Sequence, residues 1–208
     1  MKFEFLEEYE TKRFSFINDR DCVVVKISGS EYTACQNPDM YCTKDDNPST
    51  RGLGNTKENP SRVERTGRLG ECACSKLFGV EVNFDRIEGG DGGIDFTWNN
   101  LTFDIKTALS LKNATKYKKN FLKGLDKRGN PMELHADVYI PSFIVEEDQE
   151  KKFATVALVG WMAKDRLLHL HRDTGCIQSP VYKNQWNYEL PFKATKPIVP
   201  LVEAIRTL

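Results

Sequence analysis

Residues 94–106 decide the fold, and they read Ile94-Asp95-Phe96-Thr97-Trp98-Asn99-Asn100-Leu101-Thr102-Phe103-Asp104-Ile105-Lys106. Asn tolerates positive φ better than most residues, so Asn99-Asn100 predicts a two-residue turn between two antiparallel strands. This turn sets a register in which Trp98 pairs with Leu101 and, three pairs further on, Asp95 pairs with Asp104. The stretch therefore predicts a β-hairpin with two acids directly opposite each other.

The predicted hairpin has an apolar face and a polar face, because side chains alternate along a strand. The apolar face holds Ile94, Phe96, Trp98, Leu101, Phe103 and Ile105, and the polar face holds Asp95, Thr97, Thr102, Asp104 and Lys106. Facing carboxylates, with Cβ atoms roughly 5 Å apart, repel unless a cation lies between them. Mg²⁺ prefers carboxylate oxygens and keeps water ligands, which predicts a metal site. The alternative is a half-exposed hairpin in which Lys106 neutralises the pair.

The order of the acids and the lysine resembles the PD-(D/E)XK nuclease superfamily: Glu71, then Gly89-Gly90-Asp91-Gly92-Gly93-Ile94-Asp95, then Asp104-Ile105-Lys106. The glycine-rich run is especially similar to restriction-endonuclease-like members of the Mrr type. The resemblance implies a DNA-cleaving enzyme that uses Mg²⁺ or Mn²⁺. Its implied catalytic residues are Glu71, Asp95, Asp104 and Lys106, and its implied metal ligands are Asp95, Asp104, Ile105 through its carbonyl, and Glu71. Asp104 stands where many members have Glu, which is within the family's pattern.

A helix is predicted to begin at Pro60, with Asn59 as its cap, and to end before Gly79. Glu71 lies on this helix, and Glu64, two turns earlier on nearly the same face, is an alternative to it. Small side chains would let the helix lie close to a sheet and bring a short Glu side chain to a strand end; they belong to Gly67, Gly70, Ala73 and Cys74.

Further strands are predicted at residues 22–27, 136–145 and 155–162, and a helix at 163–168. This order predicts an α/β protein with a mixed β-sheet flanked by α-helices. The resemblance implies a restriction-endonuclease-like core in that sheet.

One domain is expected over residues 1–208, because this length suffices for one sizeable core. Within it, residues 59–170 are the predicted catalytic core. Residues 1–58 are an amino-terminal elaboration, and residues 171–208 are an extension that wraps the core.

Residues 111–130 are strongly basic, with Asp126 as their only acid. The predicted nucleic-acid-binding residues are Lys112, Lys116, Lys118, Lys119 and Lys123, and Tyr117 and Phe121 between them offer surfaces on which bases can stack. The alternative is a solvated basic linker. The acidic run at 146–150 predicts a solvated hairpin tip without a catalytic role.

Composition is that of an ordinary globular protein, with 39% hydrophobic and 29% charged residues. The net charge is zero, which excludes a globally cationic nucleic-acid binder and leaves DNA contact to local patches. No apolar run approaches the roughly 20 residues that span a bilayer, and the first residues are too acidic for a signal peptide. We therefore expect a cytoplasmic protein without membrane contact.

Other candidate sites have weaker patterns. Six cysteines contain no Cys-x-x-Cys pair, and Cys72 and Cys74 would point about 200° apart on a helix, so free structural thiols are favoured over a metal cluster. His169 and His171 could share one strand face, but further zinc ligands at suitable spacing are missing. Asp91 is a rival metal ligand within the glycine-rich loop, which is either a phosphate-binding nest or the turn that delivers Asp95.

Two alternatives to a nuclease stay open in the sequence. One is a nucleic-acid-binding module that keeps the same fold but does not cleave. The other is a structural or interaction protein whose polar hairpin face is only solvated. A single site cuts one strand, so cleavage of both strands would indicate a homodimer.

Overall fold

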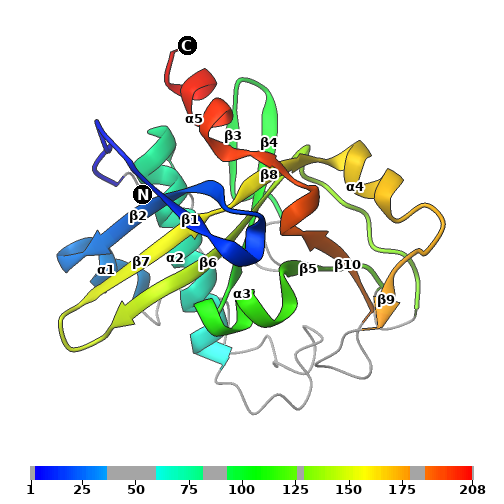
Figure 1. Cartoon of the computed structure of the whole chain (residues 1–208), viewed down its shortest axis with the longest axis horizontal. Coiled ribbons are helices and arrows are strands. Elements are labelled where there is room, and N and C mark those ends of the chain that lie inside the picture. The colour runs from blue at the N-terminus through cyan, green and yellow to red at the C-terminus, as the bar shows by residue number, and fades with distance from the viewer. Residues whose placement is uncertain (1–2, 37–59, 82–92, 126–128, 179–185, 208) are drawn as a thin grey trace.

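The computed structural model describes residues 3–36, 60–81, 93–125, 129–178 and 186–207 of the 208-residue chain. It is a mixed α/β protein with a mainly antiparallel eight-stranded sheet and a small three-stranded sheet (Figure 1). No helix within the described ranges is long and apolar enough to cross a membrane.

The main sheet runs in the order β1 (Glu10–Phe14), β2 (Arg20–Ser28), β7 (Phe153–Leu158), β6 (Val138–Asp148), β4 (Leu101–Ala108) and β3 (Phe96–Trp98). Off this path, β8 (Gly160–Ala163) pairs with β6 and with β11 (Lys196–Pro197). The pairing of β4 with β6 is parallel, and the other pairings are antiparallel. The predicted mixed sheet is therefore confirmed.

The small sheet consists of β5 (Lys119–Lys123), β10 (Trp186–Pro191) and β9 (Ile177–Gln178), all antiparallel. The chain enters β5 through α3 (Leu111–Tyr117), directly after β4. This small sheet packs on the main sheet through Tyr139 of β6, which shares a buried cluster with Leu122 and Leu190. The parallel connection from β4 to β6 thus contains a helix and a strand of the second sheet.

Helices α1 (Gly29–Gln36), α2 (Pro60–Phe78) and α5 (Ile198–Arg206) cover the other face of the main sheet. The predicted helix is confirmed as α2, and Gly79 directly after it has a φ of +68°, a left-handed conformation that favours glycine. Asn59, the predicted cap, lies outside the described residues. The predicted helix at 163–168 is confirmed as α4 (Lys164–Leu170).

Both ends of the chain contribute to the central core. Val25 of β2 and Val202 of α5 are fully buried in the same cluster as Phe103 and Ile140. Residues 186–191, in the predicted extension, form the middle strand of the small sheet. The amino-terminal elaboration and the carboxyl-terminal extension thus share their cores with residues 59–170.

The predicted strand at 155–162 is wrong in one respect, because it is two strands, β7 and β8, separated at Val159. Both pair with β6, and the register shifts by one residue between the pairs Ser142–Leu158 and Tyr139–Met162. Pro141 lies between them in β6 and has no amide hydrogen to donate, so the ladder is interrupted there.

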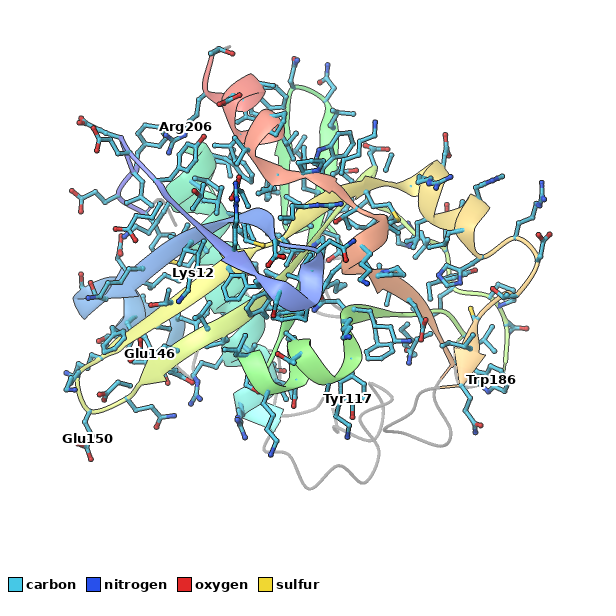
Figure 2. All side chains as sticks on the ribbon, in the orientation of Figure 1. Lys12, Tyr117, Glu146, Glu150, Trp186 and Arg206 are labelled. Atoms are coloured by element: carbon cyan, nitrogen blue, oxygen red, sulfur yellow. The ribbon has the colours of Figure 1, made fainter. Side chains whose placement is uncertain are left out.

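The predicted solvated acidic tip is also wrong in part, because β6 continues to Asp148. Glu147 is half-buried and accepts a 2.8 Å hydrogen bond from the Tyr32 hydroxyl. It also forms an ion pair with Arg65, with 3.3 Å between Oε2 and Nη2. Glu146 and Glu150 are exposed at this end of the sheet, as Figure 2 shows. Glu147 therefore joins α1, α2 and β6 instead of facing water.

Candidate functional site

The hairpin of β3 and β4 provides the first part of the candidate site. The predicted pairs Phe96–Phe103, Thr97–Thr102 and Trp98–Leu101 are confirmed. Asn99 and Asn100 have φ values of 48° and 64°, so both central turn residues are left-handed, as a type I′ turn requires. The turn therefore fixes which residues of β4 lie beyond the ladder, next to Asp95.

The predicted pairing of Asp95 with Asp104 is wrong, because the ladder ends one pair earlier, at Phe96–Phe103. The amide of Asp95 donates to the Phe103 carbonyl, at 2.8 Å. Its carboxylate accepts a 2.6 Å hydrogen bond from the backbone amide of Ile105. The Asp95 carboxylate thus replaces a backbone carbonyl as the partner of the Ile105 amide, beyond the last pair of the ladder.

Asp104 and Lys106 project from the same face of β4, two residues apart. Asp104 is only 3% exposed, which contradicts a solvated polar face at this position. β4 lies inside the sheet between β3 and β6. The residue of β6 that pairs in register with Asp104 is Tyr139, which is buried beneath the small sheet. The ammonium of Lys106 forms an ion pair with the Asp104 carboxylate, while its side chain stays partly exposed. The site thus reaches from a buried carboxylate to the surface.

Helix α2 brings Glu71 to this hairpin through a close contact at Gly70. A Cβ atom added to Gly70 would lie 2.0 Å from Thr107 Oγ1 and 3.2 Å from Ile105 Cγ2, so only glycine fits this approach. The prediction that small residues let the helix lie against the strand is confirmed at this position. Glu71, one residue further, is partly exposed and lies near enough to Asp95 to affect its titration.

The pKa of Asp95 is raised well above its usual range, chiefly by burial and then by the negative charges of Glu71 and Asp104. Lys106 and the Ile105 amide act in the opposite direction. The pKa of the buried Cys74 thiol is raised too, by burial first and then by Asp95 and Glu71. The charges of Glu71 and Asp104 therefore act on the Asp95 carboxyl group, and a cation between these acids would relieve their repulsion.

The described residues contain no group of three or more His, Cys, Asp or Glu side chains arranged to hold a metal ion as they stand. One oxygen of Asp104 is paired with Lys106, and one oxygen of Asp95 with the Ile105 amide. Mg²⁺ needs only one or two protein carboxylates, because it keeps several waters. The two carboxylates of Asp95 and Asp104 satisfy that number, and the metal-binding roles of Asp95, Asp104, Glu71 and the Ile105 carbonyl all stay predictions.

Part of the glycine-rich motif lies outside the described residues, namely Gly89 to Gly92 with the rival ligand Asp91. Gly93 has a φ of +79°, and a Cβ added there would lie 3.8 Å from Asp104 Oδ2. The left-handed backbone at Gly93 is the turn that leads into Asp95. This last residue of the motif therefore passes close to the Asp104 carboxylate.

The basic segment is folded, and the alternative of a solvated linker is wrong for residues 111–123. Lys112 and Lys116 lie on α3, and Lys119 and Lys123 on β5. Lys118, between the two elements, is left-handed with a φ of 56°. Lys119 forms an ion pair with Glu189 of β10, whereas the other four make no ion pair with described residues. Asp126, Lys127 and Arg128 lie outside the described residues.

The histidine pair does not share a strand face. His169 is exposed on α4, and His171 is buried just beyond the end of that helix. The His171 Nε2 atom lies 2.7 Å from the Glu189 carbonyl oxygen, so this ring fixes the small sheet. The described cysteines are free thiols, and the Cys35 thiol donates a 3.8 Å hydrogen bond to the Arg68 carbonyl. Both observations favour structural roles.

Three residues beside the site carry no signal in the sequence. Tyr139 pairs in register with Asp104 on the neighbouring strand. Ser142 donates a 3.3 Å hydrogen bond to the Lys106 carbonyl, and Asn120 of β5 donates through Nδ2 to the Ser142 carbonyl, also at 3.3 Å. Strand alternation predicts which face each residue occupies, but the parallel register that brings β6 beside β4 is a long-range feature.

Comparison of the chain with protein-family models, with curated proteins and with solved structures finds no match.

Proposed function

We propose that this protein is a metal-dependent endonuclease that hydrolyses DNA phosphodiester bonds through a PD-(D/E)XK-type site. The observation that carries the proposal is the arrangement of Asp95, Asp104 and Lys106. Asp95 lies directly before β3, Asp104 is buried on β4, and Lys106 pairs with Asp104 while its side chain stays partly exposed. A carboxyl group whose pKa is strongly raised by burial and by neighbouring acids, as that of Asp95 is, is more frequent at functional sites than elsewhere.

The topology supports a restriction-endonuclease-like core. Helix α2 lies on the hairpin strand β4, β4 runs parallel to β6, and β6 is antiparallel to β7. A helical acid, an acid at the start of one strand and an acid-X-Lys on the next strand therefore meet on one hairpin. This is the order that the motif resemblance implies for Glu71, Asp95, Asp104 and Lys106.

The cofactor that fits these residues is Mg²⁺, with Mn²⁺ as a substitute. Asp95 and Asp104 would hold it, with Glu71 and the Ile105 carbonyl completing the protein ligands. When bound, it would lower the pKa of a water molecule and neutralise charge on the phosphate in the transition state. The Ile105 amide keeps the Asp95 carboxylate oriented, and burial keeps Asp104 in one position.

Lys106 would orient the attacking water and help to remove its proton. It pairs with Asp104, it lowers the pKa of Asp95, and its side chain is partly exposed. Attack on phosphorus breaks the bond to the 3′ oxygen and leaves a 5′-phosphate and a 3′-hydroxyl. The leaving oxygen takes up a proton from solvent.

A nucleic-acid-binding module without cleavage is the second candidate function. The observation that favours it is the ion pair of Lys106 with Asp104, which occupies an oxygen that a metal would need. If the protein is a nuclease, Lys106 would have to release this Asp104 oxygen for a metal to be held there. In a module without cleavage the ion pair persists with metal present.

The test is cleavage of supercoiled plasmid and of single-stranded DNA with Mg²⁺, Mn²⁺ or EDTA. Asp104→Asn and Lys106→Met should abolish metal-dependent cutting. Asp21→Asn and Lys12→Met are matched controls, because both are surface charges on β1 and β2, and they should cut like wild type. If wild type cuts neither substrate with either metal, the nuclease proposal is wrong. Metal-independent binding of DNA would then support the second candidate.

The products of the same plasmid assay also test the oligomeric state. Direct conversion to linear DNA would support a homodimer with two sites, whereas accumulation of nicked circles would support a monomer. The described cysteines are free thiols, which supports a reducing location such as the cytoplasm.

A further inference from the structure

A strip of alternating lysines and aromatic rings lies on the surface formed by α3 and β5. The strip consists of Lys116, Tyr117, Lys118, Lys119, Phe121 and Lys123. The rings of Tyr117 and Phe121 meet edge to face, with centroids 5.9 Å apart and planes at 73°. A lysine accompanies each ring: the Lys116 ammonium lies 4.9 Å from the Tyr117 centroid, and that of Lys119 lies 5.8 Å from the Phe121 centroid.

Strand alternation explains why these side chains lie at the surface. Asn120 and Leu122 of β5 are buried and point toward the main sheet, so Lys119, Phe121 and Lys123 point to the opposite side. Both rings of the strip are partly exposed. Figure 2 shows Tyr117 at the end of α3, with its side chain directed away from the strands of the main sheet. A ring that served only the core would not need to lie between lysines at the surface.

The strip is connected to the candidate acidic site by a short chain of hydrogen bonds. Asn120, between Lys119 and Phe121, donates to the Ser142 carbonyl, and the Ser142 hydroxyl donates to the Lys106 carbonyl. Each bond is 3.3 Å long. Ser142 of β6 therefore links β5, which carries part of the strip, to β4, which carries Lys106.

The strip has an excess of positive charge. Glu189 pairs with Lys119 and faces Phe121 across the ladder, and it is the acid that contacts the strip among the described residues. Lys116, Lys118 and Lys123 make no ion pair within the described part of the chain. Three ammonium groups that have no ion-pair partner among the described residues, beside two aromatic rings, suit a ligand with regularly spaced anions and flat apolar groups.

We infer that this strip binds an unpaired polynucleotide strand, with bases stacked on Tyr117 and Phe121 and phosphates contacted by Lys116, Lys118 and Lys123. Stacking on protein rings requires exposed base faces, which a duplex conceals between neighbouring pairs. The inference rests on the proposed function, because it names the strand that the acidic site would receive. The preferred substrate is then single-stranded DNA, or DNA with an unpaired end or flap, in place of an intact duplex.

The experiment measures fluorescence anisotropy in EDTA, where cleavage does not occur. The probes are a labelled 20-mer of deoxythymidine, its uridine counterpart, a 20-mer duplex, and an abasic 20-mer that keeps the phosphates without bases. The variants are Phe121→Leu, Tyr117→Leu and Phe121→Trp. Phe153→Leu is the control, because Phe153 is a partly exposed ring on β7 of the main sheet, with the Lys26 ammonium 5.0 Å from its centroid. Thermal unfolding verifies that each variant is folded.

Wild type should bind the thymidine strand more tightly than the duplex or the abasic strand. Phe121→Leu and Tyr117→Leu should each weaken thymidine binding by roughly 5- to 100-fold and leave abasic binding unchanged, whereas Phe121→Trp and the control should resemble wild type. Tight uridine binding with the same variant pattern would identify RNA as the unpaired strand.

Duplex binding as tight as single-strand binding, or equal thymidine binding by wild type and folded Phe121→Leu, would overturn the inference. If the protein cuts plasmid but its binding does not depend on Tyr117 and Phe121, the proposed nuclease function stands and the inference about the strip is wrong. If binding depends on the two rings but no DNA is cut with metal, the inference about the strip stands and the proposed nuclease function is wrong.

Discussion

The Asp95 carboxylate accepts a hydrogen bond from the Ile105 backbone amide, with 2.6 Å between Oδ2 and N. Ile105 lies between Asp104 and Lys106, so this bond fixes Asp95 relative to both. It also gives the hairpin a contact beyond the end of its backbone ladder. The same carboxylate is therefore a structural acceptor and a candidate metal ligand.

The two roles of Asp95 can be separated by two substitutions. Asp95→Ala leaves the Ile105 amide without its acceptor, which destabilises a protein by about 1–3 kcal/mol. Asp95→Asn retains an acceptor oxygen for the Ile105 amide and cannot ionise. We expect urea unfolding in EDTA at pH 7.5 to show Asp95→Asn more stable than Asp95→Ala by that amount. Both variants should lose cleavage, and equal stability would mean that the hydrogen bond does not support the fold.

The raised pKa of Asp95 predicts a pH dependence of stability. Its pKa is raised chiefly by burial, and then by Glu71 and Asp104. Above about pH 4 the unfolded carboxyl group releases a proton that the folded one keeps, so the free energy of unfolding should decrease as pH rises toward the folded pKa. The slope is at most about 1.4 kcal/mol per pH unit for one group.

Unfolding in urea and EDTA between pH 4.5 and 8 tests this slope, and Asp95→Asn should reduce it. Asp137 is the matched control, because hydrogen bonds from Thr102 lower its pKa. A lowered pKa contributes stability that is lost only as pH decreases below the unfolded value. Asp137→Asn should therefore leave the slope above pH 5 unchanged, and a wild-type stability that rises with pH would contradict the prediction.

Two glycines of α2 should respond oppositely to the same substitution. In Gly70→Ala the new Cβ would meet Thr107 Oγ1 at 2.0 Å, which forces the helix away from β4 and destabilises by about 1–3 kcal/mol or more. In Gly67→Ala the nearest atom is Glu71 Oε1 at 3.7 Å, an ordinary contact. Better helix propensity should then stabilise by about 0.5–1 kcal/mol. Thermal unfolding distinguishes the two, and equal effects would contradict the close approach of α2 to β4 at Gly70.

Local features of the fold were predictable because their causes are local. The Asn99-Asn100 turn and the helix between Pro60 and Gly79 depend on backbone preferences of a few adjacent residues. The ladder from Trp98 to Phe96 followed from the turn alone. Beyond that ladder, the Asp95 side chain accepts the hydrogen bond of the Ile105 amide in place of a backbone carbonyl. The alternation of side chains along a strand does not predict such a replacement.

The burial of Asp104 was not predictable, because it depends on segments far apart in the sequence. Tyr139, its neighbour in register, is covered by Leu122 of β5 and Leu190 of β10. Glu147 shows the same effect at the other end of β6, where Tyr32 and Arg65 convert an apparent solvated tip into a half-buried junction. Charge patterns in sequence indicate solvation only when no segment distant in the sequence packs over them.

The ion pair between Lys106 and Asp104 predicts that the lysine opposes metal binding while it supports catalysis. Lys106→Met frees an Asp104 oxygen and removes a positive charge that repels Mg²⁺. The Mg²⁺ concentration that gives half of the maximal rise in melting temperature should therefore decrease by roughly fivefold, equal to about 1 kcal/mol. Cleavage should be lost, and Lys12→Met should alter neither property. Weaker Mg²⁺ binding in Lys106→Met would mean that the lysine stabilises the metal-bound arrangement, and the competition between the two cations for Asp104 would have to be abandoned.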